Sequence, residues 1–116
     1  MKKSILALVL ALSATAGLAS EYSCFGTEPF WGAKITKSEL MVDDFENQSS
    51  EVITSKNTAI GVGEEYVFVV KTKNKSMTVV TGECSDGMSD TIYSHHAVLD
   101  LGNNKVFYGC CNVQKK

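Results

Sequence analysis

Apolar and polar residues alternate along most of the chain beyond its first twenty positions. This two-residue period is typical of β-strands that bury one face in a core. The alternation is most regular in segment 91–101. Segment 66–73 begins with apolar residues on both faces, which predicts a central place in a sheet. The residues predicted to share the buried face of segment 91–101 are Tyr93, His95, Ala97, Leu99 and Leu101. The segments predicted as strands are 30–36, 39–43, 51–60, 66–73, 77–81, 91–101 and 105–111.

Turn-forming residues separate these segments. Residues 74–75 (Asn-Lys) and 102–104 (Gly-Asn-Asn) are predicted hairpin turns. Residues 61–63 (Gly-Val-Gly) end a strand, and the polar segments 44–50 and 84–90 are predicted loops.

Helical periodicity is nearly absent. Only segment 38–45 offers a competing helix, and the strand is favoured there because the segment is short and lacks a sustained 3.6-residue period. About seven short strands at close spacing predict an all-β, antiparallel fold, either a small barrel or a sandwich.

The N-terminus has the pattern of a secretory signal peptide. Lys2 and Lys3 precede an apolar run over 5–12, and the small residues Gly17 and Ala19 suit a cleavage site after position 19. A transmembrane helix needs about 20 apolar residues, more than this run offers. We therefore expect a signal peptide over 1–19, a single β domain over 20–116, and a periplasmic or secreted protein without a membrane span.

The charge balance bears on the partners to expect. The chain has eleven basic residues, two of them in the leader, against thirteen acidic ones, so the mature chain carries a net charge of about −4. Every basic residue is a lysine. Such a chain lacks the basic face that nucleic acids require and is not drawn to anionic membranes. A basic protein is the partner that this surface would suit.

The four cysteines predict two disulfides, since the chain is expected to be exported. Cys110 and Cys111 are neighbours, and neighbouring side chains in a strand point to opposite faces. We therefore expect one of them to bond to Cys24 and the other to Cys84, with both pairings open.

Three carboxylates are candidate site residues. Glu28 lies in the turn before Pro29, and Asp86 and Asp90 lie in the loop that follows Cys84. If disulfides bring the turn and the loop together, the carboxylates converge and could perform acid–base chemistry or hold a hard cation. The structural alternative is that they accept hydrogen bonds from backbone amides of the turn and loop.

Other candidate residues give weaker signals. His95 and His96 are predicted to face opposite ways, so they do not converge on one metal, and His95 is expected to be structural. Phe30 and Trp31 are either exposed binding anchors or, as we favour, part of the core. The chain has no Gly-x-Ser-x-Gly sequence and no phosphate-binding glycine loop. We expect a protein that is not an enzyme and uses no cofactor or metal.

Three stretches resemble those of a family of small, uncharacterised bacterial envelope proteins. They are residues 26–31 (Gly-Thr-Glu-Pro-Phe-Trp), 84–90 (Cys-x-Asp-x-Met-Ser-Asp) and 109–111 (Gly-Cys-Cys). The family often continues the second stretch as Asp-Arg-x-Tyr-Pro, whereas Asp90 is followed in this chain by Thr-Ile-Tyr-Ser. The resemblance implies an envelope location and a disulfide-bonded β fold. It brings no catalytic residues.

A looser resemblance is to the periplasmic inhibitors of c-type lysozyme, which share the size, export, disulfides and acidic surface expected of this chain. The leading expectation is a monomeric, non-enzymatic binding module of the cell envelope. One alternative is a lysozyme inhibitor whose acidic loop around Asp86 and Asp90 meets the basic cleft of the enzyme. The other is a hydrolase or metal-dependent enzyme that uses Glu28, Asp86, Asp90 or His95.

Overall fold

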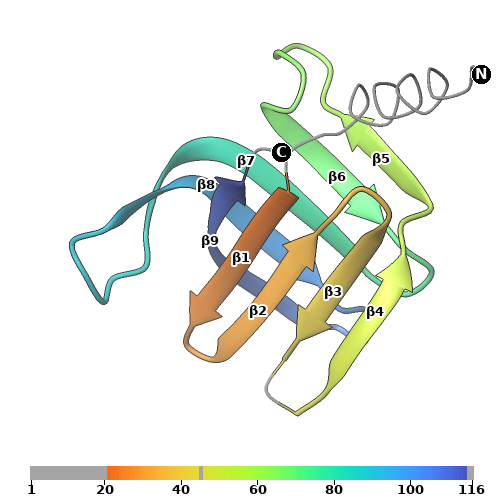
Figure 1. Ribbon diagram of the computed structural model, residues 1–116, viewed down its shortest axis with the longest axis horizontal. Coiled ribbons are helices and arrows are strands. Elements are labelled where there is room, and N and C mark those ends of the chain that lie inside the picture. Colours follow the sequence, from red (N-terminus) through yellow and green to blue (C-terminus); the bar gives the residue numbers. More distant parts are fainter. Residues whose placement is uncertain (1–20, 45, 115–116) are drawn as a thin grey trace, which may run out of the picture.

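The computed structural model describes residues 21–44 and 46–114, so the expected signal peptide over 1–19 lies outside the described part. Nine antiparallel strands form one sheet, which curls into a half-barrel (Figure 1). The strands are β1 Glu21–Thr27, β2 Phe30–Ile35, β3 Glu39–Asp43, β4 Gln48–Val52, β5 Ser55–Thr58, β6 Val67–Lys71, β7 Ser76–Ser85, β8 Ile92–Asp100 and β9 Val106–Gln114. Their order across the sheet is β4-β3-β2-β1-β9-β8-β7-β6-β5. No described residue belongs to a helix long and apolar enough to cross a membrane.

The predicted all-β, antiparallel fold is confirmed, but the predicted number of about seven strands is wrong. Strand β1 was missed because it ends at Thr27, directly before the Glu28–Pro29 turn, and because Gly26 resembles a turn residue. Buried and partly buried residues nevertheless alternate along the whole of β1. The predicted single strand 51–60 is wrong, because this segment is divided between the end of β4 and β5. Strand β4 begins in the predicted loop 44–50, because an exposed edge strand of polar residues has no hydrophobic period.

The predicted central place of segment 66–73 is also wrong. Strand β6 is next to the edge strand β5, whereas β1 and β9 pair in the middle of the sheet. Phe68 and Val70 point into the core and are fully buried, while Val67 and Val69 on the other face are only partly buried. Apolar residues occur on both faces of β6 because its outer face is also partly buried, although the strand is not central.

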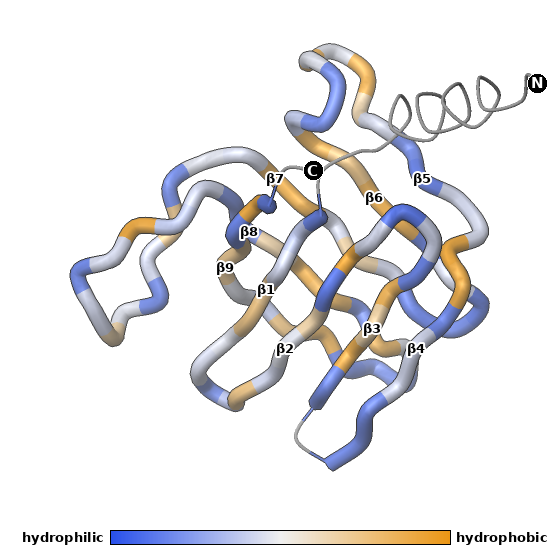
Figure 2. Tube along the Cα trace, viewed as in Figure 1, coloured by the Kyte–Doolittle hydropathy of each residue, from blue (hydrophilic) through white to orange (hydrophobic). Residues whose placement is uncertain are grey.

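The core lies inside the curl, between the layer formed by β1–β4 and the layer formed by β6–β9. Figure 2 shows hydrophobic residues along the strands and hydrophilic residues at most hairpin turns. The residues of the core are Tyr22, Cys24, Trp31, Ala33, Ile35, Leu40, Val42, Phe68, Val70, Met77, Val79, Ala97, Leu99 and Cys111.

Trp31 packs flat against two glycines from neighbouring strands. A Cβ atom at Gly26 would lie 2.0 Å from Trp31 Nε1, and one at Gly109 would lie 2.8 Å from Trp31 Cζ2. The indole stacks on Phe107 and its Nε1 donates a hydrogen bond of 3.3 Å to the carbonyl of Tyr108. Trp31 is 5% exposed, so it belongs to the core and is not an exposed binding anchor. This packing also explains why glycine stands in both sequence stretches. Phe30 is 62% exposed, so its expected place in the core is wrong.

The two disulfides lie on opposite faces of β9, as expected for neighbouring cysteines. Cys24 bonds to Cys111, which is its direct partner across the β1–β9 pair, and both belong to the core. Cys84 bonds to Cys110 and ties β7 to β9 across the intervening β8. The structure thus selects one of the two pairings that the sequence left open.

Glu51 closes the gap between the edge strand β4 and the β6–β7 turn. Its carboxylate accepts hydrogen bonds from the Thr72 hydroxyl, from the Asn74 side-chain amide at 2.9 Å and from the Asn74 backbone at 3.2 Å. Lys75 Nζ lies 3.3 Å away. These bonds, that of the Asn74 side chain foremost, lower the pKa of Glu51 from 4.5 to about 2.

We expect Glu51→Gln to lower the free energy of unfolding at pH 7 by about 1.5–3 kcal/mol, because hydrogen bonds to a charged acceptor are lost. The folded pKa is below the unfolded one. This contribution is therefore complete above the unfolded pKa and is lost as the pH falls toward about 2. Urea unfolding at pH 7 and at pH 3 checks this: the difference between the two proteins should shrink at pH 3.

Glu46→Gln is the control, since Glu46 is an exposed turn residue whose side chain makes no hydrogen bond to a described residue. Equal stability of the Glu51→Gln and Glu46→Gln proteins at pH 7 would contradict the role of Glu51.

Candidate functional site

The far end of the β7–β8 hairpin is held against the outer face of β1 and β9. The Cys84–Cys110 bond joins it to β9, and the Tyr93 ring meets the Phe25 ring edge to face with centroids 4.9 Å apart. The pairing of β7 with β8 shifts register between Thr81 and Cys84. Such a bulge bends a hairpin and changes the direction of its side chains. The loop after Cys84 therefore begins beside the β1–β2 turn and then projects from the body of the sheet (Figure 1).

A cleft of about 160 Å³ lies where the turn and the loop meet. Its lining residues are Phe25, Gly26, Thr27, Glu28, Ser85, Asp86, Tyr108, Gly109 and Cys110. Two of the three candidate carboxylates, Glu28 and Asp86, therefore share this cleft although they are far apart in the sequence. The third, Asp90, is exposed farther along the loop and does not line it.

The two carboxylates of the cleft differ in their bonding. Asp86 Oδ1 accepts hydrogen bonds from the backbone amides of Met88 at 2.8 Å and Ser89 at 3.2 Å, so it holds the loop in a turn. Glu28 is exposed and makes no hydrogen bond or ion pair with another described residue. The expected bonds from Glu28 to amides of the Cys84 loop are thus not formed, and its carboxylate faces solvent with both oxygens available.

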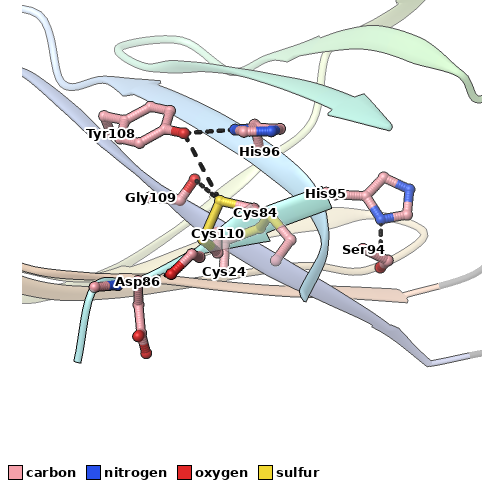
Figure 3. Close-up of a disulfide and its surroundings, with 12 residues drawn as sticks. Cys24, Cys84, Asp86, Ser94, His95, His96, Tyr108, Gly109 and Cys110 are labelled. Carbon is pink, nitrogen blue, oxygen red and sulfur yellow. Dashed lines mark hydrogen bonds between the residues drawn. A yellow bond between two sulfur atoms is a disulfide. The ribbon is translucent and has the colours of Figure 1, made fainter. Parts of the chain in front are cut away.

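Tyr108, which lines the cleft, and His96, which does not, lie beside the Cys84–Cys110 bond, the outer disulfide (Figure 3). The Tyr108 hydroxyl lies 2.5 Å from His96 Nδ1 and 3.7 Å from Cys84 Sγ. Tyr108 is 59% exposed. Sequence reasoning missed Tyr108 as a site residue. The sequence did contain an indication: Tyr108 and Cys110 are two residues apart in one predicted strand, which places their side chains on the same face.

His95 lies on the other face of β8, away from the cleft (Figure 3). Its Nδ1 is 2.7 Å from the Ser94 hydroxyl, and its ring packs against Tyr22 in the core layer. Burial lowers the pKa of His95, so the ring is neutral at pH 7. The expectation that the adjacent histidines face opposite ways is confirmed, and His95 does not join the carboxylates.

The β7–β8 hairpin carries acidic residues without basic ones. No lysine occurs between Lys75 and Lys105, whereas Glu83, Asp86 and Asp90 are all present there. Two large apolar residues of the same hairpin tip, Met88 and Ile92, are exposed. An exposed tip that combines uncompensated negative charge with apolar side chains has the chemistry of a protein interface. We define the acidic tip as residues 83–92.

A larger, shallow depression of about 590 Å³ lies over β1–β4. Its lining residues are Cys24, Gly32, Ala33, Lys34, Met41, Val42, Asp43, Gln48, Ser49 and Ser50. None of the predicted binding residues lies in it. Among the described residues, no group of three or more His, Cys, Asp or Glu side chains is placed to hold a metal ion.

Comparisons of the chain with protein-family models, with curated proteins and with solved structures found no match. The case for a function therefore depends on the geometry of the cleft and the acidic tip.

Proposed function

We propose that the chain is an exported, non-enzymatic binding protein that presents its acidic tip and the adjoining cleft to a basic protein. One observation carries this proposal: Glu28 and Asp86, from separate parts of the sequence, line one cleft that contains no basic residue. The Cys84–Cys110 bond fixes the loop beside that cleft. Rigid placement reduces the entropy that a loop would lose on binding.

The cleft suits a lysine or arginine side chain of the partner. The cationic group would lie near Glu28 and Asp86, whose free oxygens can accept charge-assisted hydrogen bonds. The aliphatic stem would pack on the Phe25 and Tyr108 rings, which also favour a nearby cation. The exposed charges of the acidic tip would add long-range attraction, which speeds association and weakens as salt increases.

The enzyme alternative has less support in this geometry. It requires Glu28, Asp86, Asp90 or His95 to converge at one centre. His95 lies on the opposite face of β8 from His96 and faces Tyr22, and Asp90 does not line the cleft. Glu28 is exposed and Asp86 is only partly buried, which suits recognition of a cation better than proton transfer.

The proposed location is the periplasm or the exterior of the cell. Two disulfides favour an oxidising compartment, and the leader sequence and the resemblance to envelope proteins support the same location. A lysozyme is the partner to test first, because it is a basic protein whose cleft can admit an acidic loop. Membership in the envelope family is part of this proposal.

We expect the oxidised protein to bind immobilised c-type lysozyme with micromolar or tighter affinity at low salt and about tenfold more weakly at physiological salt. Replacement of both Glu28 and Asp86 by the neutral amides should weaken binding about tenfold or more, because the cation loses both acceptors. Surface plasmon resonance at two salt concentrations measures both effects.

Asp44→Asn is the matched control. Asp44 caps the β3–β4 turn by accepting hydrogen bonds from Glu46 and Asn47, as Asp86 does in its own loop. Asp44→Asn removes one charge from the same kind of turn outside the cleft, as Asp86→Asn alone does at the cleft. The control should bind like the unchanged protein, whereas Asp86→Asn alone should bind more weakly. Absence of binding to every lysozyme tested, or equal weakening by the control, would remove the proposed partner.

A further inference from the structure

The β5–β6 hairpin covers the end of the half-barrel where β1 begins (Figure 1). Strand β5 is a four-residue edge strand that pairs only with β6. The loop 59–66 projects from it and exposes the large apolar residues Ile60, Val62 and Tyr66. A short edge strand with an exposed loop has little packing of its own, so other contacts must hold it against the barrel.

Glu65 supplies those contacts. Its Oε1 accepts a hydrogen bond of 2.6 Å from the hydroxyl of Tyr22 in β1, and its Oε2 lies 2.5 Å from Nζ of Lys56 in β5. Lys56 Nζ also lies 4.5 Å from the centroid of the Phe68 ring. One carboxylate thus joins the loop, the edge strand and the middle of the sheet.

The backbone at Glu65 supports a specific role for this side chain. Its φ is 65°, in the left-handed region that costs a residue with a Cβ about 1 kcal/mol or more. Such a conformation persists where other contacts compensate for it. The two bonds of the carboxylate provide that compensation.

The charged and titratable groups that face Glu65 come from three strands: Tyr22 from β1, Lys56 from β5 and His95 from β8. Burial raises the pKa of Glu65, but the bonds from Lys56 and Tyr22 outweigh this and hold it below its ordinary value. Burial, together with the bond to Glu65, raises the pKa of Tyr22 above its ordinary range, so the phenol remains a donor. At pH 7 the group contains an ionised Glu65, a cationic Lys56 and a neutral His95.

We infer that Glu65 is a latch that holds β5 and the loop 59–66 over Tyr22, Phe68 and His95, and that β5 and this loop open locally when the carboxylate is neutralised. Strand β6 stays in place because it pairs with β7, and β5 and its loop move about it. Lys56 lines a cavity of about 100 Å³ together with Tyr22, Ile35 and Val70. Opening therefore exposes this apolar cavity to solvent. This inference is independent of the acidic tip and the proposed partner.

Amide hydrogen exchange on the oxidised protein tests the latch. In Glu65→Gln, exchange at Ala59, which bonds to the Val67 carbonyl, and at the other β5–β6 amides should rise about ten- to a hundredfold. Amides of the β8–β9 pair should keep their rates. Glu64→Gln is the matched control, because Glu64 is the exposed neighbour whose side chain makes no hydrogen bond or ion pair with a described residue, and it should change nothing.

Tyr22→Phe provides a second test should Glu65→Gln fold poorly. It removes the hydroxyl and keeps the ring packing on Phe68, so it should increase the exchange rates of the same amides about tenfold. Two results would overturn the inference. One is exchange in Glu65→Gln and Tyr22→Phe that matches Glu64→Gln. The other is an equal increase in every strand, which would mean that the contacts stabilise the whole fold and not the hairpin.

Discussion

Replacing Cys24 and Cys111 together by alanine is expected to lower the free energy of unfolding by about 2–5 kcal/mol. The bond closes a loop across a sequence separation of 87 residues, so its loss gives the unfolded chain much new freedom. Both sulfurs are also buried in the core, where their packing is lost. For a domain of this size each kcal/mol corresponds to about 4–8 °C in melting temperature, and differential scanning calorimetry would measure the change.

The Cys84→Ala, Cys110→Ala double variant is the matched comparison. Its bond spans 26 residues. By the chain-entropy relation, the Cys24–Cys111 bond, which closes the longer loop, should stabilise the fold by about 1 kcal/mol more. We also expect this second variant to loosen the acidic tip selectively, because the outer disulfide holds it to β9. An unchanged melting temperature after loss of the Cys24–Cys111 bond would contradict its place at the centre of the sheet.

Replacing Gly109 by alanine is expected to cost about 3 kcal/mol, the upper end of what overpacking usually costs. The new Cβ atom would lie 2.0 Å from the backbone oxygen of Phe25 and 2.8 Å from the Trp31 indole. The backbone oxygen cannot recede, because Phe25 pairs with Cys110 in the β1–β9 ladder. The melting temperature and the near-ultraviolet circular dichroism of Trp31 should both change.

Gly32→Ala is the control for this substitution. Gly32 is also a strand glycine, but its Cβ would have only an ordinary contact at 3.9 Å, with the Cys24 carbonyl. Alanine there should be neutral or stabilise slightly, by about 0.5 kcal/mol, because glycine loses more backbone entropy on folding. Similar losses at Gly32 and Gly109 would mean that the strands disfavour alanine generally and that the indole site is not special.

The fold class could be predicted from the sequence because alternation and turn residues are local properties. These local properties did not predict strands that form only because a neighbouring strand pairs with them. Strand β4 contains the polar sequence Gln-Ser-Ser-Glu-Val and forms because β3 offers it a partner. Gly26 resembled a turn residue, whereas it is a strand residue that leaves room for Trp31.

The disulfide pairing depends on which strands are neighbours, and the sequence does not state this. Neighbouring cysteines implied bonds on opposite faces of the last strand, and that much was predictable. The choice of Cys111 for Cys24 follows only from the pairing of β1 with β9.

The candidate site was partly predictable. The idea that Glu28 and Asp86 meet depended on disulfides that bring the turn and the loop together. The Cys84–Cys110 bond ties the loop to β9, and the pairing of β1 with β9 places the Glu28 turn beside it. The place of Asp90 outside the cleft depends on the path of the loop, which the sequence does not show. The role of Glu65 could not be predicted from the sequence, because it depends on a hydrogen bond with Tyr22, which lies 43 residues earlier in the chain.

The measurement that tests the central claim most directly is an NMR titration of the isotope-labelled, oxidised protein with unlabelled c-type lysozyme at low salt. We predict that amide shifts concentrate at Glu28, Asp86, Asp90 and Tyr108, and that they diminish as salt is added. Shifts over the β1–β4 depression or the β5–β6 hairpin, with none at the cleft, would contradict the proposed binding site. So would a spectrum that the partner leaves unchanged.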